Sequence, residues 1–109
     1  MFRHVVMWNY KEGFTPEQNR ENALKIKAGL EGLKGVVPGI VDIKVHINEL
    51  EYSNKDVMLD STFEDEAGFL AYKKHPAHVE AGALTKDFLD HRVCLDYIEH
   101  GSMWQRSVR

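Results

Sequence analysis

Two residue types that can exchange protons lie close together in the second half of the chain. Tyr72 is followed by the run His75-Pro76-Ala77-His78. Pro76 disfavours helical geometry at His75 and suits the first position of a new helix, so we expect His78 in the first turn of that helix. The positive end of the helix dipole disfavours an imidazolium there, so His78 should be neutral and able to accept a proton. The pattern predicts acid–base chemistry by His78, with Tyr72 orienting a polar group of the ligand.

A purely structural interpretation of the same segment stays open. A Tyr–His pair is not specific, and His78 could cap the helix or pack locally while His75 is exposed. The two histidines do not predict a metal site, because Pro76 breaks the regular helical spacing and no third ligand is near in sequence. We therefore expect neither a metal nor another cofactor.

Further candidate residues lie on predicted strands. His4 and Trp8 share one face of the first strand, because residues four apart in a strand do. If that face turns toward the helices, the two residues line a cavity together with Ile26 and Tyr72. A hydrogen-bonded core histidine and a space-filling tryptophan are the alternative. The residues predicted to bind a substrate are His4, Trp8, Ile26, Leu59, His75 and Asp96.

The elements that must position these residues follow from the apolar spacing. The first helix opens with a capping box at Thr15, and we expect it to end at Gly35. The predicted strands span residues 2–10, 40–47, 56–63 and 91–99, and the predicted helices span 16–34, 64–74 and 76–89. Helices segregated from an antiparallel sheet indicate an α+β fold, here the ferredoxin-like βαββαβ arrangement with four antiparallel strands.

The first and last strands predict a homodimer. The runs over residues 4–8 and 93–98 do not alternate cleanly between apolar and polar types, which is typical of strands covered on both faces. The helices can cover only one face. Two adjacent strands of this kind would leave a contiguous apolar patch, which usually marks an interface. We therefore expect two sheets to pack face to face as a dimeric α+β barrel.

The bulk composition excludes several protein classes. At 109 residues, the chain is expected to form one domain over residues 1–99 and a tail over 100–109. The formal net charge of −3, without a basic stripe, argues against nucleic acid. No segment has the length or apolarity to span a membrane, so we expect no membrane partner and a cytoplasmic location. The single cysteine, Cys94, rules out an internal disulfide and is expected to be a small core residue.

The motifs together resemble the stress-responsive A/B barrel family. The resemblance runs over residues 2–98, from His4-Val5-Val6 through the Val37-Pro38-Gly39 turn and Thr62-Phe63-Glu64 to Asp96-Tyr97. Its most specific part is the His-Pro-x-His element that follows Tyr72. The resemblance implies a dimeric α+β barrel.

The resemblance also carries functional expectations. The family includes stress-induced proteins without a settled activity and a polyketide cyclase in which a Tyr and the second His of the motif act on the substrate. Tyr72 and His78 match those positions, whereas Asn22, Ala23 and Ile26 replace aromatic residues that shape the cyclase cavity. We therefore expect a homodimer that binds a small apolar or aromatic molecule. A polyketide-cyclase-like lyase and a cofactor-independent monooxygenase-like enzyme are the alternatives.

Overall fold

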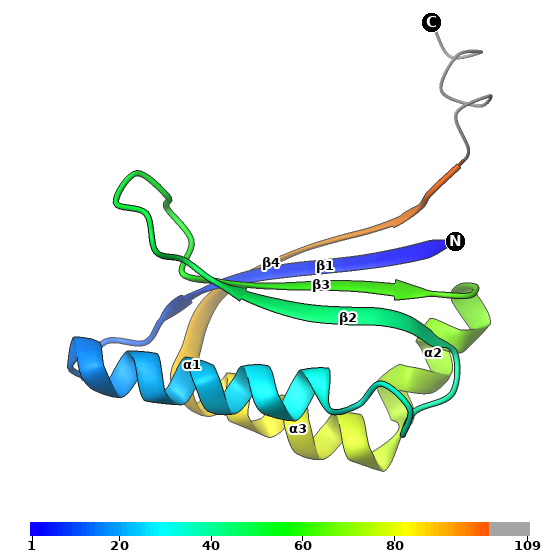
Figure 1. The fold of residues 1–109 in the computed structure, drawn as a ribbon, viewed down its shortest axis with the longest axis horizontal. Helices are drawn as coiled ribbons and strands as arrows, with labels where there is room; N and C mark the ends of the chain where they lie inside the picture. The colour runs from blue at the N-terminus through cyan, green and yellow to red at the C-terminus, as the bar shows by residue number, and fades with distance from the viewer. Residues whose placement is uncertain (101–109) are drawn as a thin grey trace, which may run out of the picture.

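The computed structural model, which describes residues 1–100, is a twisted sheet with all its helices on one face (Figure 1). In chain order the elements are β1 (Phe2–Tyr10), α1 (Pro16–Glu31), β2 (Ile40–Ile47), β3 (Val57–Phe63), α2 (Glu66–Lys74), α3 (Pro76–Phe88) and β4 (Leu89–Ile98). The four strands run antiparallel in the order β2-β3-β1-β4. The predicted ferredoxin-like α+β fold is confirmed. Residues 101–109 of the expected tail lie outside the described residues.

α1 begins at the capping box that the sequence predicted, but it does not end where the sequence predicted. The hydroxyl of Thr15 accepts a hydrogen bond from the backbone N–H of Gln18, whose side chain accepts one from the backbone N–H of Thr15. The helix ends at Glu31 with Gly32 as its C-cap, so the predicted end at Gly35 was wrong. Gly35 instead adopts a φ of 87° in the turn that follows, where a side chain would be strained.

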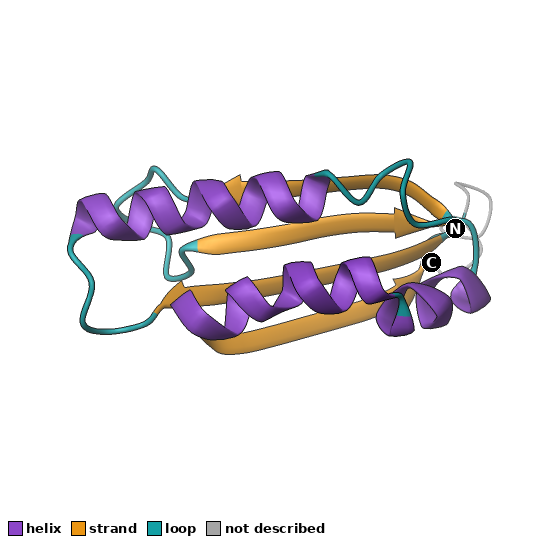
Figure 2. Cartoon of the chain, turned by 90° about the horizontal axis from the view of Figure 1, so that it is seen from below, coloured by secondary structure: helices purple, strands orange, loops and turns teal. Residues whose placement is uncertain are grey.

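The core lies between the sheet and the helix layer. Alternate residues of β1 are buried beneath the helices, in the order Phe2, His4, Val6 and Trp8. Seen from the helix side, α1 and α3 lie next to one another across the sheet (Figure 2). α1 contacts β2, whereas α3 lies toward β4. Of the described helices, none is long and apolar enough to cross a membrane.

β4 forms an edge of the sheet, and this position corrects one expectation. Cys94 was expected in the core, yet it is exposed in the single chain. It pairs with Val6 and therefore faces the helix side. The helices do not reach far enough to cover the outer part of β4, so every residue of this strand after Leu89 is exposed.

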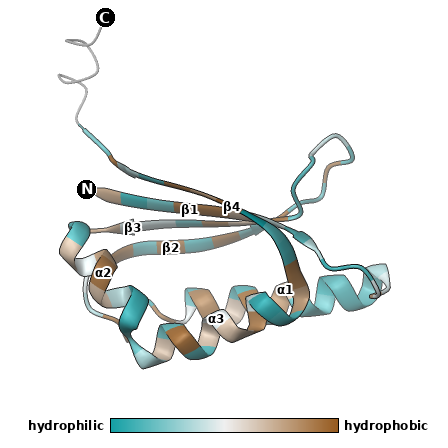
Figure 3. Cartoon of the chain, turned by 180° about the vertical axis from the view of Figure 1, so that it is seen from behind, coloured by the Kyte–Doolittle hydropathy of each residue, from teal (hydrophilic) through white to brown (hydrophobic). Residues whose placement is uncertain are grey.

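The back of the sheet carries the apolar patch that the sequence predicted. Leu95 pairs with Val5, and Val93 pairs with Met7, so all four side chains point away from the helices. Leu95 is 64% exposed and Val93 is 45% exposed. Apolar colours follow β1 and β4 where they run side by side (Figure 3). We define the back patch as Val5, Met7, Met58, Val93 and Leu95.

Candidate functional site

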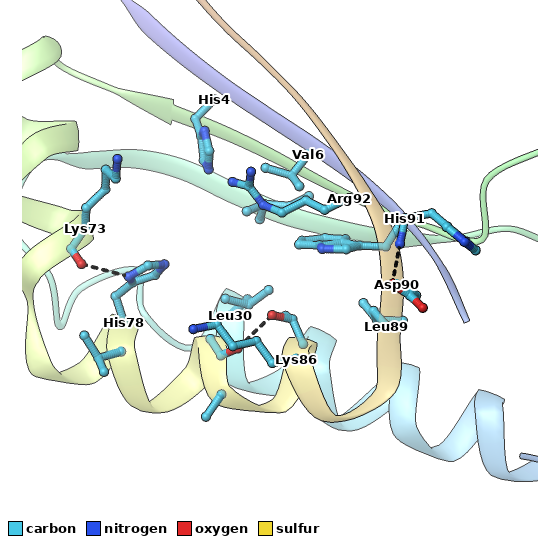
Figure 4. A pocket seen from close by; sticks show the side chains of 16 residues that line it. His4, Val6, Leu30, Lys73, His78, Lys86, Leu89, Asp90, His91 and Arg92 are labelled. Carbon is cyan, nitrogen blue, oxygen red and sulfur yellow. Dashed lines mark hydrogen bonds between the residues drawn. The ribbon is translucent and has the colours of Figure 1, made fainter. Parts of the chain in front are cut away.

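A cavity of about 550 Å³ opens between the sheet and α3 (Figure 4). Its apolar floor combines residues from the sheet with residues at the helix ends. These floor residues are Val6, Trp8, Leu30, Leu59 and Leu89. The polar residues around this floor include His4, Lys73, His78, Lys86 and Arg92. An apolar volume with a few polar groups at its rim is typical of a small-molecule site.

His78 is held at the cavity wall by the break between α2 and α3. His75 caps α3, because its Nδ1 accepts a hydrogen bond from the backbone N–H of Ala77 at 3.1 Å. His78 lies within the first turn of α3, with its Nδ1 3.3 Å from the carbonyl oxygen of Lys73. A carbonyl can only accept, so this contact assigns the proton to Nδ1 and leaves Nε2 as the free acceptor. The second ring nitrogen lies on the cavity side (Figure 4).

The surroundings of His78 favour its neutral form. Burial lowers the pKa of His78 below 6.5, and the positive charge of Lys73 acts in the same direction. The hydrogen bond to the Lys73 carbonyl opposes this shift without reversing it. A neutral imidazole with a free Nε2 at the edge of a cavity can accept a proton from a bound molecule.

Tyr72 lies directly behind His78, inside the wall of the cavity. The two rings are 4.2 Å apart between centroids, and Tyr72 is fully buried. Within the described part of the chain, the Tyr72 hydroxyl has no hydrogen-bond partner. Burial raises the pKa of this phenol, so it stays protonated near neutral pH and keeps an O–H that can donate a hydrogen bond. Tyr72 is not among the residues that line the cavity surface.

His4 is fixed from the opposite side by Asp96. The His4 Nδ1 is hydrogen-bonded to the carboxylate of Asp96, which directly faces it on β4. Burial lowers the pKa of His4, and the carboxylate of Asp96 partly offsets that effect. Because the carboxylate accepts the Nδ1 proton, Nε2 of His4 is left free, as it is in His78.

His4, Cys94 and Asp96 are the described residues whose donor atoms gather as a metal site would require, within 4.8 Å of one another. The local charge opposes a cation there. Arg92 lies against the Cys94 thiol, and both Arg92 and Lys73 act on His4 with positive charge. Burial, followed by the charge of Asp96, raises the pKa of Cys94, which also disfavours the thiolate that a metal needs. The cluster therefore fits a hydrogen-bonded support for His4 better than a metal centre.

The structure brings part of the predicted site together. His4, Trp8, Leu59 and His78 line the cavity. Ile26 is fully buried in the core, as Tyr72 is. His75 caps α3 and Asp96 lies behind His4, so these two support lining residues without themselves lining the cavity.

Sequence reasoning did not identify the three cations at the cavity, Lys73, Lys86 and Arg92. Lysines and arginines are common on exposed helix and strand positions, so their types gave no signal. A helical reading of residues 76–89 places Lys86 two turns beyond His78, and this spacing could have indicated a shared face. For Arg92 no comparable signal existed, because its direction depends on an irregularity in β4.

Comparison with known proteins places the chain among proteins of similar fold. The chain is 27% identical over 103 residues to a stress-response A/B barrel domain-containing protein of Arabidopsis thaliana, covering 88% of this chain and 84% of that protein. A dimeric ferredoxin-like protein of unknown function from Bacteroides fragilis has a similar structure. Its TM-score is 0.84 at 24% identity, covering 90% of this chain and 95% of that one.

Two further solved structures share the fold. A dimeric ferredoxin-like protein of unknown function from Thermobifida fusca gives a TM-score of 0.73 at 23% identity, covering 90% of each chain. A hydroxynitrile lyase from Passiflora edulis gives 0.70 at 20% identity, covering 93% of this chain and 94% of that one. The model of the stress-responsive A/B barrel domain matches residues 2–99. The chain belongs to the stress-responsive A/B barrel family.

Proposed function

We propose that this protein is a homodimer in which each subunit binds a small apolar or aromatic molecule between its sheet and α3. The observation that carries the proposal is the cavity of about 550 Å³, with its apolar floor and its two inward-facing histidines. This volume is within the range of ordinary small-molecule sites.

The back patch supports the homodimer. Exposed apolar side chains on two adjacent strands are costly to leave in water, at about 25 cal/mol for each Å² of apolar surface. The remaining strand of the back face, β2, is polar there, with Lys44 and His46 exposed. The related structures from Bacteroides fragilis and Thermobifida fusca are dimeric. A second copy with its own back patch offers a matching apolar surface, as an isologous dimer requires.

A cavity-filling variant tests the binding proposal. Gly82 lines the cavity, and a Cβ added there would meet no atom within 4 Å. Gly82→Phe should therefore fill the cavity, whereas Gly82→Ala should leave most of it open. We expect phenylbutanol, a neutral probe with an apolar body, to raise the melting temperature of the parent and of Gly82→Ala but not of Gly82→Phe. Equal shifts in all three proteins would contradict binding in this cavity.

A second candidate function is that of a lyase or cyclase in which His78 moves a proton. It is favoured by the neutral His78, whose Nε2 is free, and by the unpartnered hydroxyl of Tyr72 behind it. The structural relative from Passiflora edulis is a hydroxynitrile lyase, which agrees with this chemistry without assigning it. In such a reaction His78 would accept a proton from an acidic carbon. For the Tyr72 hydroxyl to donate a hydrogen bond to the oxygen that gains negative charge, the side chains in front of it would have to move, because Tyr72 is buried behind His78 and does not line the cavity.

Proton exchange separates the two candidates. Phenylacetone has acidic C–H groups beside a carbonyl, and their exchange with D₂O is followed by NMR. Catalysed exchange that His78→Ala abolishes, while phenylbutanol binding persists, would support the enzyme. Exchange at the same rate in the parent and in His78→Ala would remove His78 from any such mechanism. The control variant is Lys74→Ala, because Lys74 lies at the end of α2 and does not line the cavity.

A further inference from the structure

The cavity carries an excess of positive charge that the homodimeric binding role does not require. Lys73 comes from α2, Lys86 from α3 and Arg92 from β4, so three separate elements each supply a cation. Among the described residues that line the cavity, Asp90 is the one carboxylate. The protein as a whole has a formal net charge of −3, so this local excess is opposite in sign to the average.

Within the described residues, these cations, Lys73, Lys86 and Arg92, form no ion pair with a carboxylate. The Lys73 ammonium lies 5.6 Å from the centroid of the Phe69 ring. The Arg92 guanidinium lies beside the Cys94 thiol, which is an uncharged neighbour. An uncompensated guanidinium beside an apolar floor is therefore available to a bound anion.

A bulge in β4 directs Arg92 into the cavity. Met7 pairs with Val93 and Asn9 pairs with Asp90, so Trp8 is faced by two residues of β4, His91 and Arg92. His91 adopts a φ of 53°, which is uncommon for a residue with a side chain. The extra residue keeps both Leu89 and Arg92 on the helix side, and the Arg92 side chain reaches toward His4 (Figure 4). Bulges re-aim side chains in this way next to binding sites.

We propose that the cavity selects small carboxylic acids in their anionic form, with Arg92 as the partner of the carboxylate. The apolar body of the ligand would lie on Val6, Trp8 and Leu59, and Lys73 and Lys86 would add positive charge at the rim. A guanidinium matches a carboxylate with two parallel hydrogen bonds, which an ammonium cannot do. This inference rests on the proposed binding function and names the chemical class that the site prefers.

A matched pair of probes tests the selectivity. Phenylbutanoate and phenylbutanol share one apolar body and differ in the charged group, and calorimetry gives the dissociation constant of each. We expect the parent to bind the acid about 10- to 100-fold more tightly than the alcohol, the range for a hydrogen bond to a charged group. Arg92→Gln should remove most of this preference, so that the dissociation constants of the acid and the alcohol approach one another. Lys74→Gln removes a cation of α2 that does not line the cavity, and it should preserve the preference.

The outcomes distinguish this inference from the proposed function. Equal affinity of the parent for both probes would overturn the selectivity and leave the binding role intact. Retention of the preference in Arg92→Gln would overturn the assignment to Arg92. Failure of both probes to bind, with no difference between the parent and Gly82→Phe, would overturn the binding role as well. A far-UV spectrum of each variant checks that it is folded.

Discussion

The imidazole of His78 packs against the phenol ring of Tyr72 in a tilted arrangement, with centroids 4.2 Å apart and ring planes inclined by 43°. The contact joins α2 to α3 across His75, the residue between the two helices. Phe63 contacts the same phenol from β3, at 4.8 Å between centroids. Tyr72 is therefore held by packing in the core, and its hydroxyl contributes no hydrogen bond to the described part of the chain.

Removing that hydroxyl should separate a structural role from a functional one. In Tyr72→Phe the ring packing is kept and a buried, unpaired polar group is lost, so we expect the free energy of unfolding to stay the same or rise by about 1 kcal/mol. Urea unfolding measures this change. A loss of more than about 1 kcal/mol would show that the hydroxyl has a stabilising partner. If Tyr72 acts on a substrate, the same variant should lose phenylacetone exchange while keeping its stability.

The two histidines at the cavity should make stability depend on pH. Burial lowers the pKa values of His4 and His78 in the folded protein, so the unfolded chain binds protons first as the pH falls. The contribution of the neutral histidines is fully present well above the unfolded-state pKa of about 6.5, and it is lost as the pH falls through that value toward the lowered pKa values of the folded state. We expect the free energy of unfolding to fall between about pH 7.5 and about pH 5.5, and less steeply in His78→Gln than in the parent.

The control for this measurement is a variant that keeps both histidines and changes a charge elsewhere. Lys44→Gln removes an exposed charge on the back of the sheet and should leave the pH dependence of the parent unchanged. An identical slope in His78→Gln and in the parent would mean that His78 is not held neutral by the fold.

The sequence predicted the order of elements and most strand bounds, because period-two burial and helix caps are local signals. The β1 range was predicted correctly, since Phe2, His4, Val6 and Trp8 alternate with residues of the other face. The helix dipole argument for His78 rested on Pro76, and α3 does begin there. The roles of these residues in binding or catalysis stay predictions.

The parts that were not predicted depend on packing and on one backbone irregularity. The sequence contains no glycine near His91 to announce a positive φ, so the bulge and the direction of Arg92 had no local signal. The position of β4 at the sheet edge left Cys94 exposed, and no property of the strand itself sets its place in the sheet. The burial of Tyr72 arises from aromatic neighbours on other elements.

The support that Asp96 gives to His4 can be measured as stability. Asp96→Ala leaves the buried Nδ1–H of His4 without its acceptor, and we expect a loss of about 1–3 kcal/mol in the free energy of unfolding. Asp42→Ala is the matched control, because Asp42 forms only exposed ion pairs, at 3.6 Å with Lys34 and 3.9 Å with Lys44. That control should change stability by less than about 1 kcal/mol. Equal effects in both variants would argue against a supporting role for Asp96.

The positive φ of His91 in the bulge predicts how the stabilities of two variants at this position should rank. Glycine adopts positive φ without strain, so His91→Gly should be as stable as the parent or up to about 1 kcal/mol more stable. A β-branched residue is poorly tolerated at this φ, so His91→Val should lose about 1–2 kcal/mol. Thermal and urea unfolding measure the stabilities of the two variants and of the parent.

Because the bulge directs Arg92, His91→Val should also weaken phenylbutanoate binding more than phenylbutanol binding. Equal stability of the two variants would show that the positive φ is not maintained in solution.

The proposed homodimer can be tested by placing a charge in the back patch. Leu95 faces Val5 across the β4–β1 pair and is 64% exposed in the single chain. Leu95→Lys places a charge where a second copy would bury an apolar side chain, and burying an unpaired charge costs far more than any gain from the remaining contacts. We expect the parent to sediment as a dimer at micromolar concentration and Leu95→Lys to sediment as a monomer.

Leu70→Lys is the control, since Leu70 is similarly exposed at 48% but lies on α2, in the helix layer. A parent that sediments as a monomer would contradict the dimer. A Leu95→Lys variant that stays dimeric would move the interface away from the back patch, because a lysine buried there without a partner charge would oppose association.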